Sequence, residues 1–153
     1  MGRSSKPRRQ YRRRTATRPS GRAQLWLIEA TFSPFEELLQ HLQRDGEFEI
    51  TGEGVMVHRL YRSGHKFPVI AAFEACAEMF DIARARDAGC PDSAPLHRLI
   101  RGLEAGEISN VDLDAAASCL AALRAYTVSQ PIDVMADVAK TVEIKFRMEA
   151  LNE

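Results

Sequence analysis

The stretch VIAAFEACAEMFDIARARDAG, residues 69–89, decides the fold that the sequence predicts. Its apolar residues recur at helical spacing, as Ile70, Phe73, Ala77 and Phe80 show. They form a stripe wide enough to be covered from several sides, so we expect a long helix at the centre of the core. The closing glycine is a typical helix stop.

Four further helices are predicted around this one. Before it, Ser33, Pro34 and Glu36 match an N-cap, a first-turn proline and a capping-box acid, so we expect a helix over residues 34–44. Residues 23–30 are too few to type by periodicity, and we expect a strand or an extended lead-in there. After the central helix, apolar spacing and stop signals predict a short helix around Leu96–Leu103, one over 109–126 and a last one over 131–151.

A β-hairpin is predicted between the first two helices. After Gly46 the period changes to two, because Phe48 and Ile50 alternate with polar residues. A glycine-rich turn at 52–54 follows, and residues 55–62 (VMVHRLYR) are rich in β-formers. The fold class is therefore mainly α (α+β): a compact domain of about five helices with one β-hairpin over residues 23–153, preceded by a disordered basic arm.

The charges are divided unevenly along the chain. The 153 residues carry 21 basic and 21 acidic side chains, a formal net charge of zero. Residues 1–22 hold nine of the basic side chains and no acidic one, which leaves 12 basic against 21 acidic, a formal −9, for the rest. The basic residues of the arm are Arg3, Lys6, Arg8, Arg9, Arg12, Arg13, Arg14, Arg18 and Arg22.

This arm points to nucleic acid. Arginine presents a planar fork of donors that matches phosphate oxygens, and Tyr11 within the cluster is suited to stack on an unpaired base. The segment has too few apolar residues to fold alone. Two other interpretations stay open: the arm contacts an acidic protein surface, including its own body, or it is a solubilising or organelle-targeting segment without a specific partner.

A second basic cluster falls on the end of the predicted hairpin. Two interpretations of this cluster stay open: it is a second nucleic-acid contact, or it is a charged hairpin edge that discourages pairing with another strand. Its members are His58, Arg59, Tyr61, Arg62, His65 and Lys66.

The sequence offers little for catalysis, cofactors or membranes. None of the phosphate-loop, dinucleotide, zinc-protease or nucleophile-elbow motifs occurs, so we expect no cofactor, no metal and no small-molecule substrate. Cys90 with His97 is the only pair that we would test as an enzyme site. The apolar runs are too short for a bilayer span or an export signal, and the three widely spaced cysteines suit reduced thiols, so we expect a cytoplasmic protein.

Residues 6–12 (KPRRQYR), followed by a helix-then-Gly-Glu stretch over Phe35–Glu47, carry a family resemblance. The layout resembles small helical proteins with an Arg-rich start that phages and prophages of β-proteobacteria encode. The resemblance implies a bacterial cytoplasmic setting and a phage accessory role, including inhibition of a host or defence complex. It brings no site residues.

Together these features predict a non-enzymatic nucleic-acid-associated accessory or regulatory protein, whose helical body binds a protein partner or a second copy. The alternative is a protein-interaction module or inhibitor that presents its acidic body to a basic partner. An unrecognised enzyme is the third hypothesis.

Overall fold

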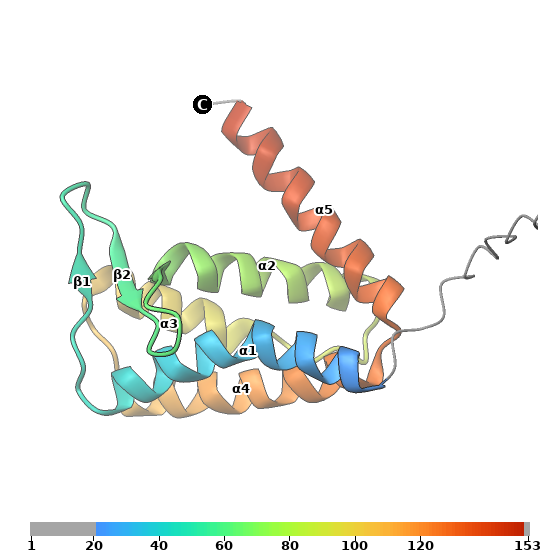
Figure 1. The fold of residues 1–153 in the computed structure, drawn as a ribbon, viewed down its shortest axis with the longest axis horizontal. Helices are drawn as coiled ribbons and strands as arrows, with labels where there is room; N and C mark the ends of the chain where they lie inside the picture. Colours follow the sequence, from blue (N-terminus) through green and yellow to red (C-terminus); the bar gives the residue numbers. More distant parts are fainter. Residues whose placement is uncertain (1–20, 152–153) are drawn as a thin grey trace, which may run out of the picture.

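The computed structural model describes residues 21–151, apart from the side chains of residues 21–24, 146 and 150 (Figure 1). Residues 1–20, which make up almost all of the predicted arm, lie outside the described residues. The five helices of the described part are α1 (Gly21–Gln43), α2 (Val69–Arg86), α3 (Ala94–Ala105), α4 (Asn110–Ser129) and α5 (Ile132–Leu151). The predicted mainly α fold with about five helices is confirmed.

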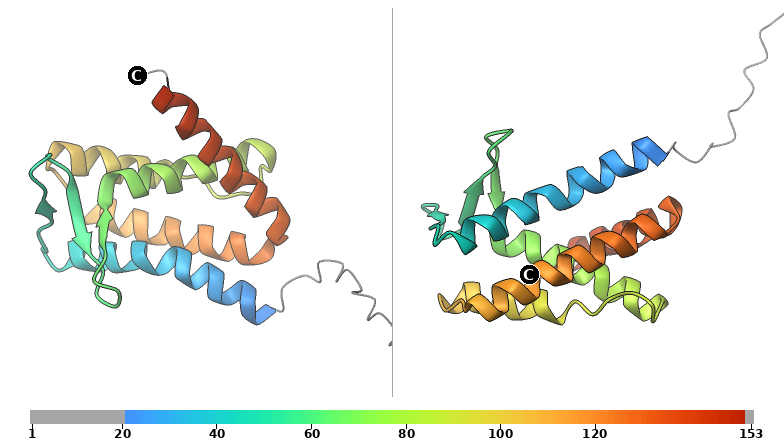
Figure 2. Two further views of the ribbon diagram at one scale, coloured as in Figure 1. Left: turned by 45° about the horizontal axis from the view of Figure 1, so that its top comes forward. Right: turned by 90° about the horizontal axis from the view of Figure 1, so that it is seen from below.

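The helices form a bundle with a small sheet at one end (Figures 1 and 2). α1 lies along α4, α3 packs between α2 and α4, and α5 packs on α2. The antiparallel sheet has the order β1 (Glu49–Ile50), β2 (Met56–Arg59), β3 (Lys66–Pro68), and β3 leads directly into α2. The last turns of α5 leave the bundle, so its C-terminal end projects (Figure 1).

One buried cluster joins the five helices. The ring of Phe35 in α1 lies 5.1 Å from the ring of Phe73 in α2 and 5.7 Å from that of Phe67 in β3, measured between centroids. Leu38, Phe73, Leu99 and Leu123 have no exposed surface. Because the sheet contributes Phe67 to the same cluster, the hairpin is held against α1 and α2 by core packing.

The prediction for the first helix was wrong at its start. α1 begins at Gly21, so residues 23–30 are helical rather than extended, and Pro34 lies inside the helix rather than in its first turn. An internal proline removes the hydrogen bond to the carbonyl four residues back and costs about 3 kcal/mol. Ile28 and Phe32 are buried on the same helix face, and each contributes roughly 1.5 to 3 kcal/mol. Burial therefore offsets the cost, and the helix continues through the proline.

The predicted hairpin is confirmed and has a third strand that was missed. β1 pairs with β2 in the register Glu49 to Val57, as the alternation indicated. The residues after β2, predicted as a turn leading to the next helix, return as β3, and His58 pairs with Phe67. Three residues that end in a proline are too few to show a period of two in the sequence. The strand is stabilised by its pairing with β2 and by the packing of Phe67.

Helices α3 and α4 end and begin where the capping residues in the sequence predict. Ser109 caps α4, because its hydroxyl oxygen accepts a hydrogen bond of 3.1 Å from the backbone N–H of Asp112. Gly106 ends α3 in the left-handed conformation, with φ +70°. These signals act within one helical turn, and tertiary packing does not override them.

Candidate functional site

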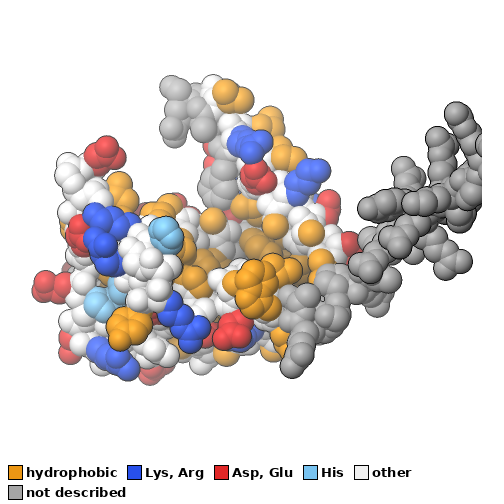
Figure 3. Space-filling model, viewed as in Figure 1, with side chains coloured by type: hydrophobic (Ala, Val, Ile, Leu, Met, Phe, Trp, Pro, Cys, Tyr) orange, Lys and Arg blue, Asp and Glu red, His pale blue; other side chains and the backbone are white. Residues whose placement is uncertain are grey.

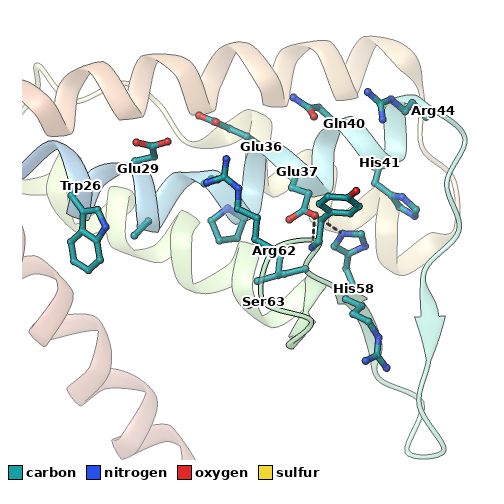
Figure 4. Close-up of a pocket in the computed structure, with 16 residues that line it drawn as sticks. Trp26, Glu29, Glu36, Glu37, Gln40, His41, Arg44, His58, Arg62 and Ser63 are labelled. Atoms are coloured by element: carbon teal, nitrogen blue, oxygen red, sulfur yellow. Dashed lines mark hydrogen bonds and ion pairs between the residues drawn. The ribbon is translucent and has the colours of Figure 1, made fainter.

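A hollow of about 1030 Å³ lies between α1 and the loop that joins β2 to β3 (Figure 4). We call it the α1–hairpin groove. One wall is α1, which contributes Trp26, Glu29, Ser33, Glu36, Glu37, Gln40, His41 and Arg44 among others, and the other wall consists of residues 58–63. Most of its lining residues have polar or charged side chains.

Glu37 holds the two walls together. Its Oε1 atom accepts a hydrogen bond of 2.7 Å from the backbone N–H of Tyr61 (Figure 4). Within the loop, the N–H of Leu60 donates to the carbonyl of His65, and the N–H of Gly64 donates to the carbonyl of Leu60. Gly64 has φ +68°, a conformation that favours glycine. The loop is therefore closed on itself and tied to the middle of α1.

His58 occupies the inner end of the groove. Its side chain is only 14% exposed, and its ring lies 4.8 Å from the ring of His41 and 5.8 Å from that of Phe48. Its buried Nε2 atom makes no hydrogen bond within the described residues. The nearest acidic atom, Oε1 of Glu37, is 3.7 Å away, beyond hydrogen-bond reach. This nitrogen is covered by protein atoms, so a group in the groove reaches it only if the surrounding side chains move.

The arginines of the groove have few internal partners. Arg44 and Arg62 make no ion pair with any described residue, whereas Arg59 contacts the carbonyl of Gly64 at 3.5 Å and its charge helps to lower the pKa of Glu49. Two acidic side chains nearby are engaged elsewhere. Glu36 pairs with Arg124 of α4 at 2.6 Å, whereas Glu37 accepts from the backbone at Tyr61. Among the described lining residues, Glu29 is the acid without such a contact.

The structure brings together four of the six residues of the predicted hairpin cluster. His58, Arg59, Tyr61 and Arg62 line the groove, and Tyr61 is 93% exposed. Lys66 instead pairs with Glu49 of β1 at 3.0 Å and, chiefly through this hydrogen bond, lowers the pKa of Glu49. His65 lies in the loop, outside the groove lining.

The residues of α1 that line the groove were not identified from the sequence. Trp26, His41 and Arg44 line it together with the hairpin residues. No local pattern marks them, since they belong to a different element and join the cluster only when the loop docks on α1. The predicted phosphate contacts of the arm, from Arg3 to Arg18 with Lys6 and Tyr11, lie outside the described residues, and so does the side chain of Arg22.

The Cys90–His97 pair does not form. His97 Nε2 lies 2.8 Å from Oδ2 of Asp81, and the hydroxyl of Ser93 donates to the other oxygen of the same carboxylate. In a nucleophilic triad the histidine stands between the hydroxyl and the acid, whereas here the acid stands between them. The Cys90 thiol is buried and directed to the carbonyls of Phe80 and Pro91, and burial raises its pKa. This arrangement ties α3 to α2 and activates no nucleophile.

Metal ligands are not clustered in the described part of the chain: it contains no group of three or more His, Cys, Asp or Glu side chains placed to hold an ion. Within the same residues, every helix is too short or too polar to span a bilayer. No family model, curated protein or solved structure matches the chain.

Proposed function

We propose that the protein is a non-enzymatic nucleic-acid-associated accessory protein of the cytoplasm. Residues 1–22 supply phosphate contacts that do not depend on sequence, and the α1–hairpin groove supplies a second contact. The observation that carries the proposal is that Arg44, Arg59 and Arg62 line one groove together with the exposed Tyr61, and that Arg44 and Arg62 make no ion pair with any described residue.

The groove suits an unpaired strand better than a duplex. Arginine forks bind phosphate oxygens, and an exposed aromatic ring offers a base a stacking surface. Tyr61 is 93% exposed and Trp26 is 68% exposed, so both rings are accessible. Glu29, which repels phosphate, can accept a hydrogen bond from a base amino group, as carboxylates do from cytosine.

The rest of the body disfavours broad contact with a polyanion. Outside residues 1–22 the formal charge is −9. Phosphate contacts are therefore confined to the arm and the groove. If six to nine phosphates of a single strand are neutralised, the logarithm of the affinity falls against the logarithm of salt with a slope of about −4 to −6.

The test is fluorescence anisotropy with labelled single- and double-stranded oligonucleotides over a salt series, on full-length chains. We expect replacement of Arg8, Arg9, Arg12, Arg13 and Arg14 by glutamine to reduce the salt slope by about 3.5, because five phosphate contacts are lost. Arg62→Gln should weaken binding several-fold and reduce the slope by about 1.

Arg147→Gln is the matched control for the groove variant. Arg147 lies on α5, outside the groove, and pairs with Glu143 one turn away. Arg147→Gln removes one positive charge, as Arg62→Gln does, but at a position outside the groove. The Arg147→Gln variant should therefore bind as tightly as the wild type. Undiminished binding by the arm variant would contradict the proposal. Equal binding by the Arg62 and Arg147 variants would remove the groove from the interface.

The body's −9 charge favours a second candidate, a protein-interaction module that presents an acidic surface to a basic partner such as a nucleic-acid channel. The phage resemblance fits this role as an inhibitor. In that case the arm variant would recover the same basic protein partner as the wild type in a pull-down. Loss of recovery with the arm variant would count against it.

A further inference from the structure

A second hollow, of about 680 Å³, lies between α1 and α5 with α2 as its floor. We call it the apolar groove. Its walls include Leu27 and Phe35 of α1 and Ala139 and Val142 of α5, and Met79 of α2 lies at its base. No charged side chain lines it among the described residues. Figure 3 shows hydrophobic side chains along α5 and in the hollow beside it.

The C-terminal part of α5 carries an apolar stripe of its own. Ile144, Met148 and Leu151 are 50%, 60% and 86% exposed and recur at i, i+4 and i+7. Successive residues of a helix are about 100° apart, so Ile144 lies about 200° around α5 from the buried Val142. The stripe therefore faces away from the core.

This stripe cannot fill the groove of its own chain. Two ion pairs fix the rotation of α5 against α2, one between Asp137 and Arg86 at 2.7 Å and one between Lys145 and Glu78. Helix α5 forms a wall of the groove and turns its stripe away from it. The molecule thus has an apolar groove and an apolar ridge that match in chemistry but cannot meet within one chain.

We propose that a second copy of this chain covers the apolar groove, with the Ile144–Met148–Leu151 stripe of each copy seated between α1 and α5 of the other. A twofold pair uses each contact twice. This inference does not rest on nucleic-acid binding.

The area agrees with a specific dimer. Three side chains of this size and exposure offer on the order of 250 Å² of apolar surface, and the walls that they cover offer a similar area. Each copy contributes both surfaces, so the pair removes about 1,000 Å² from water, the size at which specific interfaces begin.

The chain's own residues 1–20 are a poorer occupant. They contain eight basic side chains and few apolar ones. The groove presents no acidic side chain among its lining residues, so a guanidinium group placed there would lose hydration without gaining an ion pair.

Sedimentation velocity of the full chain without nucleic acid, from low to high micromolar concentration, tests the proposal. We expect the mass to rise from 17.1 kDa towards twice that value. Met148→Glu on the ridge and Ala139→Glu on the groove wall should each weaken the dimer by about 100-fold, since each change acts twice and one charge in an apolar contact costs at least tenfold. Both positions are exposed, so circular dichroism should match the wild type.

Val111→Glu is the control, because Val111 is 77% exposed on α4 and lies outside the groove lining. Its dimer should be as stable as that of the wild type. A wild-type chain that stays monomeric throughout would overturn the proposal and leave the groove to residues 1–20 or to a different protein. Equal weakening by the Val111, Met148 and Ala139 variants would also overturn it.

Discussion

The three cysteines illustrate how burial governs chemistry at the scale of a residue. Cys76, Cys90 and Cys119 are buried free thiols. Desolvation raises the pKa of Cys76 to about 12 and that of Cys119 to about 11. At neutral pH these thiols are protonated, and a protonated thiol is a poor nucleophile and a poor metal ligand. They serve as small apolar side chains of the core.

The raised thiol pKa values predict a loss of stability at alkaline pH. The unfolded thiols ionise near their ordinary pKa of 9.0, whereas Cys76 stays protonated in the fold until about 12. Between these values the unfolded state binds fewer protons, so the free energy of unfolding falls as pH rises, by at most about 1.4 kcal/mol per pH unit for each thiol. Urea unfolding over this range measures the slope.

Cys76→Ala serves as the comparison for this slope, because it removes one thiol while lysines and tyrosines still titrate. The variant should lose less stability with rising pH than the wild type. An identical pH dependence would show that Cys76 ionises equally in both states.

At the scale of an element, α3 shows a glycine kept for space rather than for flexibility. A Cβ atom on Gly102 would lie 2.7 Å from the backbone oxygen of Glu107. Glu107 returns to the helix because its N–H donates to the carbonyl of Gly102 at 2.9 Å. The close turn at the end of α3 thus requires hydrogen at this position.

Gly102→Ala should lower the free energy of unfolding by about 1 to 3 kcal/mol, since the turn must shift to admit the methyl group. Helix propensity predicts the opposite sign, a gain of about 1 kcal/mol. Gly52→Ala is the control, because nothing lies within 4 Å of its added Cβ. Chemical denaturation of both variants measures the difference. Increased stability of Gly102→Ala would show that the turn relaxes freely.

At the scale of the molecule, a single core joins bundle and sheet. Phe73 has no exposed surface and contacts Phe35, which in turn contacts Phe67 of the sheet. Sheet and helices should therefore unfold together. The α1–hairpin groove and the apolar groove lie on either side of α1 and adjoin at Ala30 and Pro34, which line both.

Phe73→Ala should cost about 3 to 5 kcal/mol, the range for a buried phenylalanine that leaves a cavity. The unfolding curves from circular dichroism and from the fluorescence of Trp26, the single tryptophan, should shift together. Val111→Ala, at an exposed position, should change stability by less than about 0.5 kcal/mol. Separate transitions for the two probes would indicate that α1 unfolds independently of the other helices.

Part of the candidate site was accessible from the sequence. The cluster around Arg59 and Arg62 is contiguous in the chain, so charge and aromatic content marked it. Arg44 lies some 15 residues earlier and gave no comparable signal. It joins the cluster because Glu37 binds the backbone of Tyr61, a contact between residues 24 positions apart. The apolar groove was missed for the same reason, since its walls come from α1, α2 and α5.

The sequence by itself determined the features whose causes lie within a few residues: the central helix, the Ser109 cap, the glycine stop at Gly106, the β1–β2 hairpin and the charge division between residues 1–22 and the rest. Only the tertiary structure decided that α1 continues through Pro34, that residues 66–68 form a strand, and that α5 leaves the bundle. Those outcomes depend on burial and pairing between distant segments, whose free energies exceed local preferences.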